Sequence, residues 1–217
     1  MFHRDPQLMI ATAVPLLMSL AIHEFAHART ALAFGDPTAK LMGRCTLNPL
    51  VHLDPIGTIA LLLVGFGWAK PVPVNYANLY PPRQAKILVS IMGPASNFAL
   101  AVSLGLLLKA ATYIPGAHAF FDTDRGAFLG MVILFTMMIN VILCVLNMLP
   151  LFPLDGHHIM RELLPVEMQV PFMHFQVRYG QMALMAIIFL PMLLRTQGLI
   201  GFLGGTVFNW LTNTIFA

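Results

Sequence analysis

Three residues near the start of the chain have the types and spacing of a metal-dependent hydrolytic centre. They are His23, Glu24 and His27, in the sequence His-Glu-Phe-Ala-His. On an α-helix, residues four positions apart share a face, so both imidazoles can bind one metal ion. Glu24 lies about 100° around the helix from His23, so its carboxylate can flank the metal without binding it. The pattern predicts a catalytic zinc site in which Glu24 is the general base.

The surroundings of this cluster favour a function for it. A bare His-Glu-x-x-His also occurs by chance, and its histidines are then ordinary core or surface residues. Here the cluster lies inside the apolar run of residues 8–34. A charge near the middle of a bilayer costs about 3 kcal/mol, so ionisable residues in such a run indicate a functional site.

The composition places the chain in a lipid bilayer. Of its 217 residues, 58% are hydrophobic and only 10% are charged, with a net charge of +3. This balance is typical of a polytopic membrane protein, and it gives no nucleic-acid-binding signal. The two cysteines, Cys45 and Cys144, provide neither a disulfide framework nor a paired thiol site, so we expect both to be free.

Apolar runs predict an all-α polytopic membrane protein with about five to six transmembrane helices. Residues 8–34, 87–109 and 126–148 are long enough to span the bilayer, and 181–194 and 199–216 form two closing segments. We expect one domain, 1–217, with a core at 8–164 and closing helices at 181–216.

The proline-rich stretch after the first helix is different in kind, because its prolines forbid a long helix. Residues 56–68 are too few for an upright span, so they predict a membrane-associated β or re-entrant segment. Pro71–Asn75 alternates proline with valine, which predicts an exposed edge strand able to accept an added strand. His52 and Asp54 are candidate ligands, but a turn or hydrogen-bonded brace is the interpretation that we favour.

Asp155 is the candidate third ligand. Pro150 and Pro153 break the third span just before it, and exposed carbonyls at membrane depth are tolerated where the chain lines a cavity. Counting residues places Asp155 at a depth similar to that of His23 and His27, and three protein ligands are what a catalytic zinc needs. The alternative role for Asp155 is an interfacial helix cap before Gly156.

Taken together, these motifs resemble the site-two protease family of intramembrane zinc metalloproteases, in its compact branch without a PDZ-like domain. The likeness covers most of residues 22–156: His-Glu-Phe-Ala-His, Asn48-Pro49-Leu50, Asp54-Pro55-Ile56-Gly57-Thr58, Gly67 to Asn75, Gly93-Pro94 with Asn97, and Asn147 to Gly156. The resemblance implies one Zn²⁺ per chain, held by His23, His27 and Asp155, with Glu24 as base. It implies hydrolysis of peptide bonds in transmembrane protein substrates, and it suggests that Asn147 holds the substrate or the developing oxyanion.

His157 and His158 directly follow Asp155-Gly156 and depart from the pattern of that family. We expect neither to be the third ligand, because a carboxylate leaves the site with less net charge than three imidazoles would. We also expect Gly156 to let the chain turn and carry both histidines towards the interface. A second-shell or pH-sensitive role for them stays open.

A membrane metal-ion transporter or carrier is the alternative function. It predicts several polar sites stacked across the bilayer and has no need of Glu24. Cation counts predict the orientation: residues 36–86 carry Lys40, Arg44, Lys70, Arg83 and Lys86, and the opposite face carries Arg4, Lys109 and Arg125. The active site should therefore lie towards the cytoplasmic leaflet, in a multi-pass protein of the plasma membrane. A homo-oligomer stays open.

Overall fold

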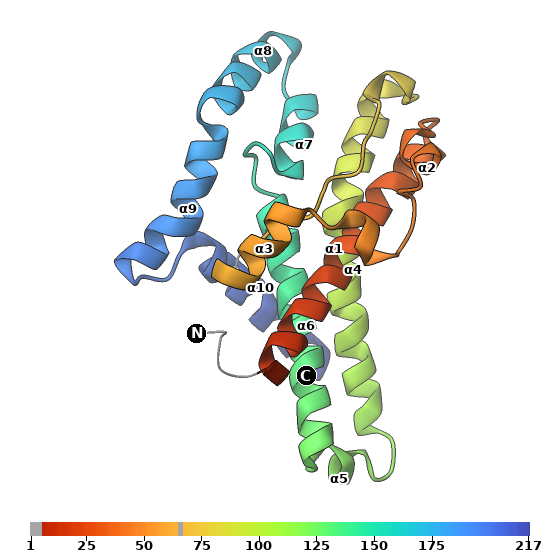
Figure 1. The fold of residues 1–217 in the computed structure, drawn as a ribbon, viewed down its shortest axis with the longest axis vertical. Helices are drawn as coiled ribbons and strands as arrows, with labels where there is room; N and C mark the ends of the chain where they lie inside the picture. The colour runs from red at the N-terminus through yellow and green to blue at the C-terminus, as the bar shows by residue number, and fades with distance from the viewer. Residues whose placement is uncertain (1–5, 65–66) are drawn as a thin grey trace.

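Long helices dominate the structure, a computed structural model that describes residues 6–64 and 67–217 (Figure 1). Three of them form the centre: α1 (Pro6–Ala33), α4 (Pro82–Thr112) and α6 (Asp124–Asn147) pack against one another. Small residues stand at these contacts, among them the buried Ala21 of α1 and Gly105 of α4. Small side chains let helix backbones approach closely where lipid surrounds the bundle.

The C-terminal helices complete the bundle on one side. α10 (Leu199–Phe216) packs on α6 and α4, where Leu211 and Ile215 join Ala101 and Val141 in a buried apolar cluster. α7 (Asp155–Leu163) packs on α4. α8 (Val166–Phe175), the π-helical η3 (Gln176–Gly180) and α9 (Gln181–Leu194) follow as one continuous rod, drawn in blue in Figure 1.

The helices are those of a membrane protein. Among the described residues, four helical segments are long and apolar enough to cross a bilayer: Pro82–Thr112, Asp124–Asn147, Val166–Leu194 and Leu199–Phe216. α1 has 28 residues and carries the polar cluster at His23. The expected spans at 87–109 and 126–148 lie in α4 and α6, whereas 181–194 is only the second half of a longer rod. Five to six spans, and the single domain with its core at 8–164, stay predictions.

Residues 55–64 form a helix, so the strand pair expected there is wrong. α3 (Pro55–Val64) begins where Oδ1 of Asp54 accepts the N–H of Gly57 at 2.8 Å, and proline suits the first helical position. Residues 65–66 lie outside the described part of the chain, and a re-entrant path stays a prediction. Within the described ranges, β pairing is limited to one antiparallel bridge between Leu53 and Ala69.

Pro71–Asn75 belongs to neither a helix nor a sheet, so the predicted edge strand is also wrong. Its prolines have no N–H. Two of its other N–H groups donate to carboxylates instead of to a strand: Val72 to Oε2 of Glu24, and Asn75 to Oδ2 of Asp36, both at 2.7 Å. We call residues 71–75 the strap, because two side chains near the end of α1 fasten it.

Short helices connect the long ones. α2 (Thr38–Leu41), η1 (Pro49–His52) and η2 (Tyr76–Asn78) lie between α1 and α4, and α5 (Ala117–Phe121) lies between α4 and α6. Figure 1 shows α2 and α5 at opposite ends of the bundle. The chain segments that the sequence placed on opposite membrane faces therefore lie at opposite ends of the molecule.

Asp36 is the anchor of the strap. It is buried, and besides the N–H of Asn75 its carboxylate accepts hydrogen bonds from the Asn78 side chain and from both the N–H and the hydroxyl of Thr38. Desolvation alone would raise the pKa of this carboxyl. The hydrogen bonds from Thr38, Asn78 and Asn75 outweigh it and hold the pKa below its usual range.

Replacing Asp36 by Asn should lower the free energy of unfolding by about 1–3 kcal/mol, because an amide nitrogen then faces bound N–H groups. A lowered carboxyl pKa contributes stability above the unfolded pKa of about 3.9, and that stability is lost as pH falls through the folded pKa. The difference between the wild type and Asp36→Asn should therefore shrink below about pH 4 in detergent thermal unfolding. Asp54→Asn is the control, because asparagine caps a helix as well as aspartate does. Equal stability of Asp36→Asn and the wild type at neutral pH would contradict the anchor.

Candidate metal centre

α1 and α7 bring the three predicted metal ligands together. His23 and His27 are buried on the face of α1 that meets α4, with 5% and 7% of their surface exposed. Asp155 is the first residue of α7. Its Oδ2 lies 3.1 Å from Nε2 of His23, and its Oδ1 lies 3.3 Å from Nε2 of His27. Of the residues that the structure describes, these form the one cluster of three or more with metal-ligand side chains.

Helix α4 fixes which nitrogen of each imidazole faces the centre. Nδ1 of His23 lies 2.7 Å from Oδ1 of Asn97, and Nδ1 of His27 lies 2.7 Å from the carbonyl oxygen of Val89. Both oxygens can only accept, so each Nδ1 must carry the hydrogen. In the neutral rings, both Nε2 atoms then present lone pairs to the centre, which is the usual arrangement of a metal-binding histidine.

The three donor groups require a positive charge between them. The two Nε2 atoms are 3.0 Å apart, and the candidate ligand atoms all lie within 4.8 Å of one another. Oδ2 of Asp155 is buried and accepts no hydrogen bond. Two lone pairs and a carboxylate at these distances repel one another in a poorly solvated site. A divalent cation removes that repulsion, and two imidazoles with one carboxylate are a zinc-binding set.

A buried hydrogen-bond network supports Asn97. Its side-chain N–H groups donate to Oδ1 of Asn140 on α6 at 2.8 Å and to the carbonyl of Ser19 on α1 at 3.2 Å. Asn140 in turn donates to the Ser19 hydroxyl at 2.7 Å. All three polar side chains are fully buried. Because the amide nitrogen of Asn97 is used in this way, its oxygen is directed to His23.

Gly93 gives the two imidazoles room against α4. A Cβ added at this position would lie 2.3 Å from Nε2 of His27 and 2.7 Å from Cε1 of His23. Both rings are held by hydrogen bonds on their other edge, so they cannot simply swing away. The absence of a side chain at Gly93 is therefore part of the centre.

Glu24 lies at the wall of a cavity of about 330 Å³ that also contains the three candidate ligands. Only 8% of its surface is exposed, and its Oε2 accepts the Val72 N–H from the strap. The strap therefore covers the centre and holds the predicted base. The lining residues are His23, Glu24, His27, Pro71, Val72, Val74, Tyr76, Val89, Ser90, Asn147, Pro153, Asp155 and His158.

Asn147 lines this cavity at the last turn of α6, and its side-chain N–H donates to the carbonyl of Leu143 at 3.0 Å. That bond uses one of the two amide hydrogens, so the second is available to a substrate or an oxyanion. The role that the family resemblance suggests for Asn147 stays a prediction.

The two histidines after Asp155 do not turn towards the interface as expected, because α7 begins at Asp155 itself. Gly156 serves close packing, since an added Cβ would meet the Leu149 carbonyl at 2.3 Å. His157 is buried, and its Nδ1–H donates to the Leu154 carbonyl at 2.6 Å. His158 lines the cavity beside Tyr76, with ring centroids 5.5 Å apart. Burial, together with His157, lowers the pKa of His158 to about 4, so its ring is neutral at pH 7.

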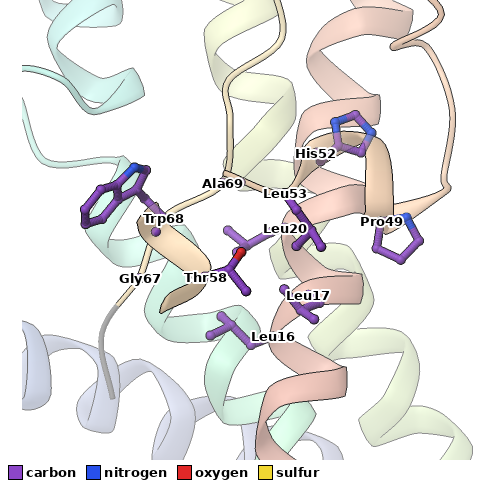
Figure 2. A pocket seen from close by; sticks show the side chains of 11 residues that line it. Leu16, Leu17, Leu20, Pro49, His52, Leu53, Thr58, Gly67, Trp68 and Ala69 are labelled. Carbon is purple, nitrogen blue, oxygen red and sulfur yellow. The ribbon is translucent and has the colours of Figure 1, made fainter. Parts of the chain in front are cut away.

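His52 lies in a different part of the fold. It is buried, its Nε2–H donates to the Thr46 carbonyl at 2.9 Å, and its own carbonyl accepts the Lys70 N–H just before the strap. Figure 2 shows it near a small apolar cavity of about 10 Å³ between α1, η1 and α3, bordered by Leu16, Leu17 and Leu20 of α1. That volume holds about one water molecule. His52 is a brace of the strap in this geometry.

Sequence reasoning missed the network behind His23 and the contact of the strap with Glu24. Ser19, Asn97 and Asn140 are polar residues inside apolar spans, and that signal alone points to a buried hydrogen-bonded group. Asn97 entered the sequence-based predictions only as part of the family resemblance, and no contact was predicted for it. No local pattern indicates which N–H group Glu24 accepts.

The sequence of the chain is similar to those of known proteins. The model of Peptidase family M50 matches residues 11–191. The protein named "Putative zinc metalloprotease YwhC" from Bacillus subtilis (strain 168) is 46% identical over 159 residues, which cover 73% of this chain and 71% of that protein. Rip2 of Mycobacterium tuberculosis (strain ATCC 25618 / H37Rv), whose name carries the same description, is 33% identical over 202 residues, 90% of this chain and 70% of Rip2.

The matches differ in how much of each relative they cover. Rip2 of Mycolicibacterium smegmatis (strain ATCC 700084 / mc(2)155) is 40% identical over 146 residues, which are 65% of this chain but only 52% of that protein. No solved structure matches the chain significantly.

A buried pair of helical histidines, a carboxylate and a flanking glutamate among apolar helices define a metal-dependent membrane hydrolase. The chain belongs to Peptidase family M50, whose model covers most of its length. It is a zinc metalloprotease, and Zn²⁺ is its cofactor.

Replacing Gly93 by Ala should lower zinc affinity at least about tenfold, because the new methyl group displaces imidazoles that Asn97 and Val89 hold in place. Zinc content after dialysis against a weak chelator measures the effect. Gly105→Ala is the matched control on the same buried helix, where a Cβ meets only the flexible ends of Ile215 and Met137. Equal zinc retention by both variants would show that Gly93 does not shape the centre.

Proposed function

We propose that the chain hydrolyses peptide bonds in or beside the transmembrane segments of membrane protein substrates. The observation that carries the proposal is the convergence of His23, His27 and Asp155 next to Glu24, in a cavity among apolar helices. The transporter alternative predicted several stacked ligand sites. One cluster of this kind is found in residues 6–64 and 67–217, and the transporter alternative gives the flanking glutamate no role in chemistry.

In this proposal His23 and His27 bind zinc through Nε2, and Asp155 binds through its carboxylate. When bound, Zn²⁺ supplies Lewis-acid polarisation of the scissile carbonyl and lowers the pKa of a water molecule. Asn97 and Val89 orient both imidazoles by accepting their Nδ1–H groups, which leaves each Nε2 directed to the centre. His157 is not a ligand in this proposal, because it is not among the residues whose ligand atoms converge within 4.8 Å of one another.

Glu24 is the general base and then the acid. Its carboxylate takes a proton from the attacking water, and it passes that proton to the leaving nitrogen as the C–N bond breaks. The Val72 N–H occupies only Oε2, so Oε1 can face the reacting atoms. The strap thereby orients the base without blocking its second oxygen.

The substrate must reach this cavity in an extended form. An intact helix keeps its carbonyls in its own hydrogen bonds, so a transmembrane substrate has to unwind before attack. The strap is not helical and borders the cavity through Pro71, Val72 and Val74. We propose that the unwound substrate aligns beside it, with main-chain hydrogen bonds that give affinity without strict sequence choice.

Replacing Glu24 by Gln should lower cleavage of an accepted membrane substrate by at least about 100-fold, because the base is lost. Zinc content should stay at the wild-type level, since glutamine can still accept the Val72 N–H. Turnover and metal content of the purified protein in detergent test both parts. Glu167→Gln, at an exposed acid of α8, is the control and should keep full activity. Normal turnover by Glu24→Gln would reject the proposed mechanism.

We also propose that the end of the molecule with α2 is cytoplasmic. The segment of residues 36–86, which includes α2, carries five Lys and Arg residues, whereas Lys109 of α4 and Arg125 of α6 flank α5 in the chain. Arg4, which the sequence also assigned to that side, lies outside the described residues. The active site would then lie in the cytoplasmic half of the bilayer of the plasma membrane.

Single cysteines at Leu41 and Tyr113 test this orientation in a chain with Cys45 and Cys144 replaced by serine. Leu41 and Tyr113 are 80% and 77% exposed, so both thiols should be reachable. An impermeant maleimide should label Tyr113→Cys in intact cells, and Leu41→Cys only after permeabilisation. The reverse labelling pattern would reject the orientation.

A further inference from the structure

The loop that precedes Asp155 has few hydrogen-bond partners for its backbone groups. We call residues 150–154 the proline loop, because Pro150 and Pro153 contribute no N–H. The N–H of Leu151 donates to the Leu149 carbonyl and that of Leu154 to the Leu151 carbonyl, each at 2.8 Å. The N–H of Phe152 remains, and a buried N–H without a partner costs about 1–3 kcal/mol.

Gln176 provides the missing partner from another part of the chain. Its Oε1 accepts the Phe152 N–H at 2.8 Å, and its Nε2–H donates to the Pro150 carbonyl at 2.8 Å. The side chain is 1% exposed. One amide therefore bonds to the proline loop as the peptide group of a neighbouring strand would, with one donor and one acceptor two residues apart.

The local backbone is built to bring Gln176 to the loop. Gln176–Gly180 is a π-helical turn inside an otherwise α-helical rod, and such turns occur frequently at functional sites. Gly180 leaves room for the contact, since an added Cβ would lie 2.7 Å from Oε1 of Gln176 and 3.1 Å from Cβ of Phe152. The wide turn and the glycine together place the amide against the loop.

The proline loop, held by Gln176, directly precedes Asp155, the candidate ligand. The ring of Phe152 meets the ring of His157 edge-on, with centroids 5.3 Å apart. His157 holds the Leu154 carbonyl through its Nδ1–H at 2.6 Å, and Leu154 is joined to Asp155. Gln176 therefore fixes Phe152, and Phe152 and His157 fix the residue before the carboxylate.

We propose that Gln176 is a positioning residue for the metal centre, which holds the proline loop so that Asp155 reaches the cation between His23 and His27. The inference rests on the proposed ligand role of Asp155. Gln176 brings no charge to the metal centre. Its two hydrogen bonds hold the conformation of the proline loop, and it affects Asp155 only through that loop. A glutamine that served only to dock the rod would affect stability without affecting the metal.

Gln176→Met tests this role, because methionine has a similar volume but neither hydrogen bond. Zinc release to a chelator is followed at a temperature where every variant is folded, and the ligand field is compared in cobalt-substituted protein. Leu184→Ala is the matched control, which shortens a buried side chain of α9 that makes no hydrogen bond to the proline loop. Gln176→Glu is a second variant, which keeps the acceptor for Phe152 but lacks the donor for Pro150 when ionised.

We expect Gln176→Met to bind zinc about 10- to 100-fold more weakly and to alter the cobalt spectrum, as loss of a supporting residue does. Leu184→Ala should leave zinc affinity and the cobalt spectrum unchanged, even if it lowers the melting temperature as much as Gln176→Met does. If Gln176→Met does not fold, Gln176→Glu should show the same two effects. Wild-type zinc binding by the Gln176 variants, or the same change in Leu184→Ala, would overturn the inference.

Asp155→Ala, measured in parallel, separates this inference from the proposed function. If Asp155→Ala loses zinc while the Gln176 variants keep it, the ligand assignment stands and the positioning role fails. If Asp155→Ala binds zinc like the wild type, the ligand assignment itself fails, and the inference fails with it.

Discussion

The candidate metal centre holds three electron-pair donors close together, where they repel one another. A bound cation relieves that repulsion. Two Nε2 atoms 3.0 Å apart and a carboxylate within 3.3 Å of them are unfavourable neighbours in a poorly solvated site. The surrounding chain nevertheless enforces this arrangement. Oxygen atoms of Asn97 and Val89 on α4 accept the two Nδ1–H groups, so neither Nδ1 can face the centre. Gly93 leaves room for both imidazole rings.

Each part of the centre comes from a different segment and needs its own support. α1 presents the histidines and Glu24, and the Ser19–Asn97–Asn140 network ties α1 to α4 and α6 behind His23. The strap orients Glu24 from one side, fastened by Asp36. The supports are backbone groups, amides and one carboxylate, which hold geometry without placing another mobile charge beside the metal.

Local patterns predicted the histidine pair and Glu24, because helical spacing alone decides which side chains share a face. Asp155 was predictable for a related reason, since Pro150 and Pro153 mark the break that frees the chain end of α6. The helical membrane fold followed from composition. The sequence could not show that Gln176 bonds to the proline loop or that Val72 bonds to Glu24, because those contacts join segments far apart in the chain.

The wrong strand predictions have the same physical origin. Alternating proline and valine at residues 71–75 favours an extended backbone, and the structure has no helix at these residues. A strand needs a partner for its N–H groups, and here two carboxylates take those N–H groups first. At residues 55–64, the cap at Asp54 and the proline that follows favour a helix, and they outweigh the short length that suggested strands.

X-ray absorption at the zinc edge of the purified protein tests the central claim most directly. The account predicts two imidazole nitrogens and oxygen ligands around the metal, with one oxygen ligand lost or replaced in Asp155→Ala. A third imidazole or a sulfur ligand in the wild-type protein would contradict the assignment of His23, His27 and Asp155.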